Sequence, residues 1–161
     1  GFEESYGYLT GSYVRDKDGV DGAYMICEMF SYYATKGISL LDKLDELYKT
    51  YGYCLNTLHS YEFDGSAGFA KMQSIMQAFR GDIKEFGGKK VVKLLDYAPG
   101  LDGLPKSDVL KFLLEDNCSI VVRPSGTEPK LKTYISVSAE NKAAAEKVEA
   151  EICESAEEYL K

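Results

Sequence analysis

The stretch "SIVVRPSGTEPKLKTYISV", residues 119–137, places a polar loop between two segments that favour β-structure. Residues 119–122 form a short apolar run, and residues 133–137 combine β-branched and aromatic side chains in an alternating pattern. Such patterns are typical of strands that bury at least one face. The stretch therefore predicts a β-hairpin whose tip is the loop at residues 123–132.

This loop carries donors suited to a phosphate group. Arg123 has a planar fork of N–H donors that can bind two phosphate oxygens at once. The hydroxyl groups of Ser125 and Thr127 are further donors. Gly126 allows neighbouring backbone N–H groups to turn toward an anion, as they do in nests. We therefore name Arg123, Ser125, Gly126 and Thr127 as the candidate phosphate-binding residues.

The charge of the loop is opposite in sign to that of the whole chain. Three basic residues, Arg123, Lys130 and Lys132, and one acid, Glu128, give a local charge of +2, whereas the chain carries −7. A proline near each end stiffens the loop, so that less order has to be imposed on binding. The alternative is a hairpin turn in which Ser-Gly-Thr serves only backbone geometry. The G-x-x-x-x-G-K-[ST] motif of P-loop NTPases is absent.

The composition is that of a folded, acidic protein. Of the 161 residues, 45% are hydrophobic and 28% are charged, enough for one large domain or two small ones. The charge of −7 argues against a general binder of nucleic acid or anionic membranes. No apolar run approaches the roughly 18 residues that span a bilayer, and no signal-peptide pattern is present. We expect a cytoplasmic protein, and the start at Gly1 indicates a segment of a longer one.

Periodicity divides the chain near residue 52. Before that point, residues 21–36 and a segment beginning at Ser39 have the apolar spacing of helices. The fold class is α+β, a sheet covered by helices on one face. We interpret the acidic face of the last helix as a solvated surface. After residue 52 we expect the order β-α-β-β-β-α. The elements are strand 53–63, helix 66–79, strand 91–97, the two strands that flank the loop, and helix 140–161. Residues 109–114 form another apolar run.

Two acidic segments are further candidates. Carboxylates beside a hydroxyl at residues 3–5 can accept hydrogen bonds from sugar hydroxyls, although an ordinary acidic turn is the simpler interpretation. Residues 15–22, "RDKDGVDG", fail as a calcium loop because Val20 occupies the third ligand position. We interpret them as a turn that caps a helix from Asp21. Lys17 in this turn can reach a phosphate if the turn faces a cleft.

The cysteines and the one histidine give no metal motif. Cys27, Cys54, Cys118 and Cys153 are too far apart in sequence for a zinc knuckle or a redox pair. They lie in apolar patterns, so we interpret them as buried free thiols. His59 lies in an alternating strand pattern without a nearby nucleophile, and we interpret it as a structural or surface residue. We therefore expect no metal ligands in this chain.

Three motifs in order resemble the phosphoglucomutase/phosphomannomutase group of the α-D-phosphohexomutases: "GFEESYGYL" at 1–9, "VRDKDGVDGA" at 14–23 and "RPSGTEPKLK" at 123–132. The likeness runs over nearly the whole chain. It implies that residues 1–52 are the end of the third of four domains. It also implies that residues 53–161 are the fourth domain, an antiparallel sheet with a fold similar to the TATA-binding protein.

The resemblance also implies roles for individual residues. Glu3 and Ser5 match a loop whose carboxylate and hydroxyl hold sugar hydroxyls. Arg123 and residues 125–127 match the phosphate-binding loop of the fourth domain. Lys17 matches a position that approaches the phosphosugar in relatives. Glucose, mannose and pentose phosphates all fit this pattern.

The implied intact enzyme moves a phosphoryl group between the 1- and 6-positions of a hexose through a phosphoserine, with Mg²⁺. Its T-x-S-H-N-P-type serine loop and D-G-D-G-D-type metal loop are absent from this sequence. We therefore expect the chain to be inactive without the upstream domains, its partners besides the phosphosugar. The alternatives are a stand-alone phosphosugar- or anion-binding module and a structural interaction domain.

Overall fold

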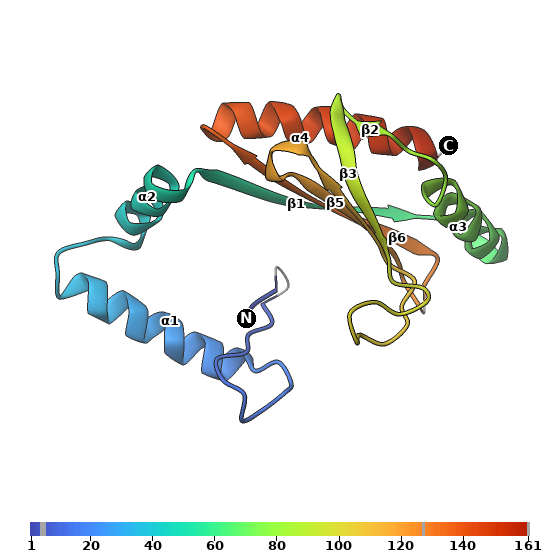
Figure 1. Cartoon of the computed structure of the whole chain (residues 1–161). Helices are drawn as coiled ribbons and strands as arrows, with labels where there is room; N and C mark the ends of the chain where they lie inside the picture. The colour runs from blue at the N-terminus through green and yellow to red at the C-terminus, as the bar shows by residue number, and fades with distance from the viewer. Residues whose placement is uncertain (4–5, 127, 161) are drawn as a thin grey trace. The chain divides into compact units, whose positions relative to one another are not determined.

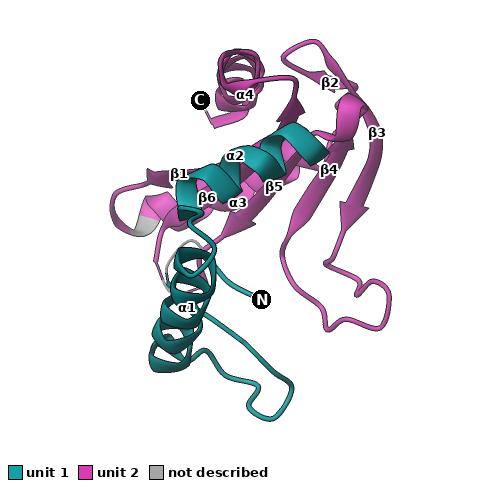
Figure 2. Cartoon of the chain, turned by 90° about the vertical axis from the view of Figure 1, so that its left-hand side faces the viewer, with its two compact units in different colours: residues 1–51 teal, residues 52–161 magenta. Residues whose placement is uncertain are grey.

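The computed structural model describes residues 1–3, 6–126 and 128–160, with residue 66 described by its backbone only. The chain forms two compact units, unit 1 over Gly1–Tyr51 and unit 2 over Gly52–Lys161 (Figure 2). The boundary falls where the apolar pattern changes from helical to strand-like spacing. Each unit can therefore be built up from its own segment of sequence.

Unit 1 contains two helices that begin at side-chain caps. The Asp18 carboxylate accepts hydrogen bonds from the N–H groups of Val20 (2.9 Å) and Asp21 (3.1 Å). Its helix therefore begins two residues before Asp21, the start expected from the sequence. In the second helix the Asp42 N–H donates to Ser39 Oγ (3.0 Å), and the Ser39 N–H donates to the Asp42 carboxylate (3.2 Å), which confirms the capping pattern. The bounds are Gly19–Ala34 for α1 and Leu40–Tyr51 for α2 (Figure 1).

Unit 1 has almost no core of its own. Among its described residues only Gly7 and Gly22 are buried. At Gly22 the Tyr8 ring lies so close that a Cβ would sit 2.5 Å from a ring carbon. The N–H of Asp18 donates to the carbonyl of Tyr8 (3.0 Å), which holds the N-terminal segment beside the start of α1. Local hydrogen bonds and one close contact, rather than apolar burial, organise this unit.

Unit 2 is a six-stranded antiparallel sheet with two helices. The strands lie in the order β1-β6-β5-β4-β3-β2. Helix α4 lies along β1 and β6, and α3 contacts β5 (Figure 1). The bounds are Tyr53–Glu62 for β1, Gly65–Phe79 for α3, Glu85–Phe86 for β2, Lys89–Asp96 for β3, Leu110–Leu114 for β4, Ser119–Pro124 for β5, Lys130–Ala139 for β6 and Lys142–Glu157 for α4.

The core of unit 2 lies on one face of the sheet. Alternate residues of β4, β5 and β6 are buried, so their side chains point toward the helices, while the intervening residues face the open side. Full burial of each large apolar side chain contributes roughly 1.5–3 kcal/mol. This arrangement confirms the predicted α+β class with helices on one face. The buried cluster contains Met72, Ile75, Met76, Phe79, Phe86, Leu110, Phe112, Leu114, Ile120, Val122, Leu131, Ile135, Val137, Ala145, Ile152 and Ala156.

Three details differ from the sequence-based expectation. The apolar run at 109–114 forms strand β4, and the sheet gains a further strand, β2, which at two residues is too short to show a period. Helix α3 begins at Gly65 with Asp64 as its N-cap residue, not at Ser66. Cys27 and Cys54 are exposed rather than buried, because one lies on a helix without a core and the other points to the open side of β1. All four cysteines are free thiols.

Candidate phosphate-binding site

The hairpin register places two cations side by side on the open face of the sheet. Strands β5 and β6 pair so that Arg123 is directly opposite Lys132. Cross-strand partners share a face, and their neighbours Val122 and Leu131 point into the core. Like charges directly opposite each other destabilise a sheet. Within the described part of the chain neither Arg123 nor Lys132 has an ion-pair partner, so a bound anion would relieve this repulsion.

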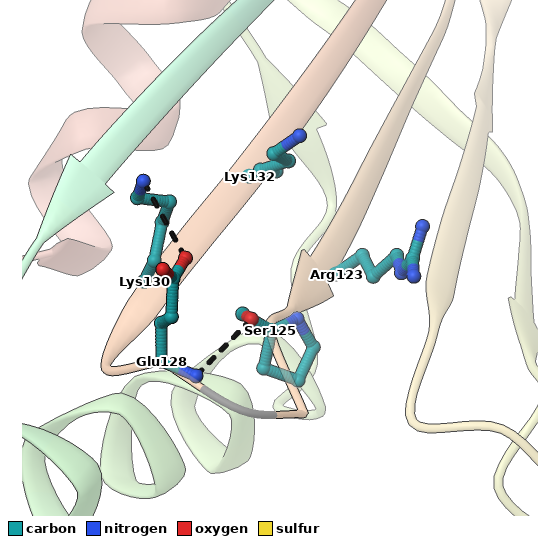
Figure 3. A pocket seen from close by; sticks show the side chains of 6 residues that line it. Arg123, Ser125, Glu128, Lys130 and Lys132 are labelled. Carbon is teal, nitrogen blue, oxygen red and sulfur yellow. Dashed lines mark hydrogen bonds and ion pairs between the residues drawn. The ribbon is translucent and has the colours of Figure 1, made fainter. Parts of the chain in front are cut away.

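Hydrogen bonds within the loop fix the shape of the hairpin tip. The Ser125 N–H donates to the Lys130 carbonyl (2.7 Å), and the Lys130 N–H donates to the Glu128 carbonyl (2.8 Å). The Ser125 hydroxyl accepts from the Glu128 N–H (3.3 Å; Figure 3). The Phe63 N–H donates to the carbonyl of Pro129 (2.9 Å) and ties the tip to the end of β1. These contacts hold residues 125 and 128–130 of the loop in place.

The loop encloses a pocket of about 200 Å³. This volume is below the range of about 300–1,000 Å³ that holds drug-sized ligands, and it suits a small anion. Arg123 and Lys132 project from neighbouring strands beside it (Figure 3). The lining residues are Arg123, Pro124, Ser125, Glu128, Lys130 and Lys132.

Lys130 has a different electrostatic role from the other two cations. Its Nζ lies 2.9 Å from Glu62 Oε1 and 3.7 Å from Glu128 Oε2. The hydrogen bond to Glu62 is the main reason why the pKa of Lys130 is raised, and Glu128 adds to it. Lys130 therefore stays charged and neutralises the carboxylates that would otherwise repel an anion. Sequence reasoning missed Glu62, because only the pairing of β1 with β6 brings it to the loop.

A second pocket, of about 380 Å³, adjoins the other side of the same loop. Asp108, which lines this pocket, is held by Arg80. The Arg80 guanidinium donates to Asp96 Oδ2 (3.0 Å) and to Asp108 Oδ1 (2.6 Å). These contacts hold the pKa of Asp96 below its usual range and anchor the connection between β3 and β4. Sequence reasoning did not identify Ser107 and Asp108, which reach the loop only through the sheet order. The lining residues are Phe69, Met72, Gln73, Ser107, Asp108, Arg123, Pro124, Ser125 and Gly126.

The backbone conformation of Gly126 is one that other residues can also adopt. Gly126 does not have a positive φ, so it is not the left-handed residue of a nest. A Cβ at this position would meet nothing within 4 Å. The space beside Gly126 is instead open toward the second pocket. Thr127, the fourth predicted loop residue, lies outside the described residues.

In unit 1 the structure brings together two of the predicted substrate-binding residues, Glu3 and Lys17. Lys17 Nζ lies 2.8 Å from Glu3 Oε2, and both side chains are about half exposed. Gly7 lies beneath this pair, since a Cβ there would be 2.4 Å from Lys17 Cδ and 2.9 Å from Glu3 Oε2. Ser5 lies outside the described residues. The turn therefore presents a carboxylate and an ammonium group side by side, which suits hydrogen bonding to a polar ligand.

The carboxylates of residues 15–22 do not form a cation site. Asp18 caps α1, and Asp16 accepts from the N–H of Lys17 (2.8 Å). Asp21 accepts from the hydroxyl groups of Thr10 and Tyr13. Each carboxylate accepts hydrogen bonds from a different local donor, so the residues present do not fit the Mg²⁺ site that the family resemblance implies for the intact enzyme.

Among the described residues, no helix has the length and apolar character needed to cross a membrane.

Comparisons with known proteins identify relatives of this chain. The phosphoglucomutases of Staphylococcus aureus (strain MSSA476) and Staphylococcus epidermidis (strain ATCC 12228) are 40% and 34% identical over 152 and 153 residues. These alignments cover 87% and 88% of this chain but 27% and 28% of the relatives, so the chain spans about a quarter of their length.

A solved structure supports the fold. It is the open form of the exocytosis-sensitive phosphoprotein pp63/parafusin from Paramecium, titled a phosphoglucomutase, with a TM-score of 0.65 and 18% identity. The match covers 93% of this chain and 28% of that one. Residues 65–155 match the family model described as "Phosphoglucomutase/phosphomannomutase, C-terminal domain". The chain therefore belongs to the phosphoglucomutase/phosphomannomutase family.

Proposed function

We propose that this chain is the phosphosugar-binding C-terminal part of a mutase that interconverts hexose 1-phosphate and hexose 6-phosphate through a phosphoserine. One observation carries the proposal: Arg123 and Lys132 are opposed across β5 and β6, without carboxylate partners among the described residues, beside a small pocket. The names of the phosphoglucomutase relatives supply the substrate class.

In this function the loop clamps the phosphate that does not react. A mutase has to hold its substrate in two orientations, with either phosphate at the reacting end. Such a reaction depends on positioning and charge neutralisation rather than on covalent chemistry by the clamp. The fork of Arg123 supplies paired N–H donors, and the Ser125 hydroxyl can add one more. Hydrogen bonds already hold residues 125 and 128–130, so binding has little to order in this part of the loop.

The sugar is recognised by unit 1 in this proposal. Glu3 accepts hydrogen bonds from sugar hydroxyls, with Ser5 beside it in the sequence, and Lys17 approaches the phosphosugar. The ion pair between Glu3 and Lys17 supports this role because it presents donor and acceptor groups together. Residues 1–52 then belong to the third domain of the family and residues 53–161 to the fourth. The reacting serine and Mg²⁺ would be supplied by upstream domains.

The binding step can be tested on the 161-residue chain by NMR titration with glucose 1-phosphate. Arg123→Ala should weaken binding by about 1.5–3 kcal/mol, because a charged hydrogen bond is lost. Lys147→Ala is the matched control, since it removes one positive charge from an exposed position of α4 outside the pocket. Equal binding by the wild type and Arg123→Ala, or equal losses in both variants, would contradict the clamp.

The chemistry is tested separately. With glucose 1-phosphate and Mg²⁺, the chain alone should give no glucose 6-phosphate, because neither a phosphoserine loop nor an aspartate-rich metal loop is present. A coupled assay would detect the product. Turnover by a pure sample would contradict the proposed division of labour between this chain and upstream domains.

A non-catalytic phosphosugar-binding module is the second candidate. It is favoured by one observation, that the pockets lined by the loop residues are lined by residues of unit 2 alone. The two functions are separated by adding the chain to upstream domains of a relative that lack their own C-terminal domain. Restored mutase activity would support the enzyme part, and phosphosugar binding without restored activity would support the module.

A further inference from the structure

A polar cluster lies between β1 and α4, on the core-facing side of the sheet. Alternate residues of β1 face this side, because their cross-strand partners on β6 are the buried ones. Residues four apart on α4 form one stripe that faces them. The cluster consists of Thr57, His59 and Tyr61 on β1 and Glu149, Cys153 and Glu157 on α4.

The contacts within this cluster are short. His59 Nε2 lies 2.7 Å from Glu149 Oε1, and the Thr57 hydroxyl donates to the same oxygen at 2.7 Å. The Glu149 side chain is only 14% exposed, so the acidic face of α4 is not a uniformly solvated surface. Ligand atoms of His59, Glu149 and Cys153 all lie within 4.8 Å of one another. This is the one such group found among the described residues.

A buried hydroxyl adjoins the cluster. Thr133, the cross-strand neighbour of His59, is 1% exposed. Its Oγ1 makes no hydrogen bond of ordinary geometry, but its hydroxyl interacts with that of Tyr61. Tyr61 completes the surroundings by donating to Glu157 Oε1 (3.0 Å), with its hydroxyl 3.9 Å from Cys153 Sγ.

We propose that His59, Glu149 and Cys153 bind a zinc-class divalent cation. Imidazole, carboxylate and thiolate are the ligands that Zn²⁺ prefers, and three protein ligands plus water is a common zinc arrangement. Ligand atoms of a tetrahedral zinc ion lie about 3.3–3.8 Å apart, given bonds of about 2.0–2.3 Å. The ligand atoms here lie 2.7–4.8 Å apart, so the three side chains would have to rotate when the ion binds. A thiolate ligand disfavours Mg²⁺, which is the metal expected for the mutase reaction, so this site would bind a different kind of cation.

Metal binding would also balance the negative charges of the cluster. A bound cation takes the thiolate and releases the proton to solvent. One thiolate and one carboxylate then balance the two charges of Zn²⁺. The ion would join β1, at the edge of the sheet, to α4.

Thermal unfolding of the untagged 161-residue chain tests the proposal. ZnCl₂ at 100-fold its dissociation constant should raise the melting temperature of unit 2 by about 10 °C, and MgCl₂ should not. His59→Gln and Cys153→Ser should each lower zinc affinity at least tenfold. Cys54→Ser is the matched control, because its exposed thiol lies on the same strand but points to the other side. It should leave zinc affinity within twofold.

Cobalt substitution gives a second readout that does not depend on stability. Co²⁺ should produce a thiolate-to-metal charge-transfer band, which is present in Cys54→Ser and absent in Cys153→Ser. Circular dichroism of each metal-free variant confirms that it is folded. The absence of any zinc-dependent shift in the folded wild type would overturn the proposal, as would zinc binding that survives both His59→Gln and Cys153→Ser. Neither result bears on phosphosugar binding by the loop.

Discussion

The two units are stabilised in different ways. Unit 2 buries three phenylalanines against one another, with ring centroids of Phe79, Phe86 and Phe112 5.1–6.4 Å apart. Unit 1 exposes most of its aromatic residues, among them Phe30 at 58% and Tyr24 at 66%. The candidate phosphate loop is thus mounted on a packed sheet, whereas Glu3 and Lys17 are held by turns and an ion pair. A clamp that must keep its geometry benefits from the packed unit.

Truncation of a core side chain should give the largest difference in stability between substitutions in the two units. Phe112→Ala should lower the free energy of unfolding of unit 2 by about 3–5 kcal/mol, because it leaves a cavity among buried side chains. Phe30→Ala in unit 1 should change it by less than about 0.5 kcal/mol, since that ring is largely exposed. Urea unfolding followed by circular dichroism measures both. Similar losses would show that the units share one core.

An acid titration should reveal a smaller difference. Arg80 holds the pKa of Asp96 below its usual value, so the folded carboxyl binds its proton less readily than the unfolded one. This contribution is complete above the unfolded pKa of about 3.9 and is lost as the pH falls through the lower folded pKa. Arg80→Ala should reduce the stability of unit 2 at pH 7 by about 1–3 kcal/mol and flatten its acid dependence.

Urea midpoints measured between pH 7 and pH 2.5 check this prediction. Glu3→Gln is the comparison in unit 1, because the pair of Glu3 with Lys17 is about half exposed and such pairs contribute about 0–1 kcal/mol. An unchanged acid slope in Arg80→Ala would rule out Asp96 as its source.

The smallest effect on stability is expected at the loop glycine. Gly126→Ala should leave the melting temperature of unit 2 unchanged, because a Cβ there has open space around it. It should still weaken phosphosugar binding if a ligand approaches this backbone. Gly22→Ala in unit 1 should loosen the N-terminal segment, since its Cβ would collide with the Tyr8 ring. Melting curves and proteolysis of residues 1–18 measure the two outcomes, and proteolysis that matches the wild type would contradict the Gly22 contact.

Sequence patterns predict those features that depend on local spacing. The hairpin at 119–137 has alternating or apolar strands, and the cap at Ser39 is a short-range motif, so both could be found. Strand β2 could not, since two residues carry no period. The roles of Glu62 and Asp108 depend on which strands become neighbours. Likewise, the contact of His59 with Glu149 joins residues 90 positions apart, and no spacing along the chain marks it.

The opposed pair of Arg123 and Lys132 has a consequence for how this protein can change. Because the two charges repel across β5 and β6, a neutral residue in place of Lys132 would make the sheet more stable and, in the proposed function, would weaken binding of the phosphate. Selection for a sturdier fold and selection for a working clamp therefore act in opposite directions on the same side chain. In the proposed function, a high concentration of phosphosugar would offset that tension, since a bound anion stabilises the folded state by mass action.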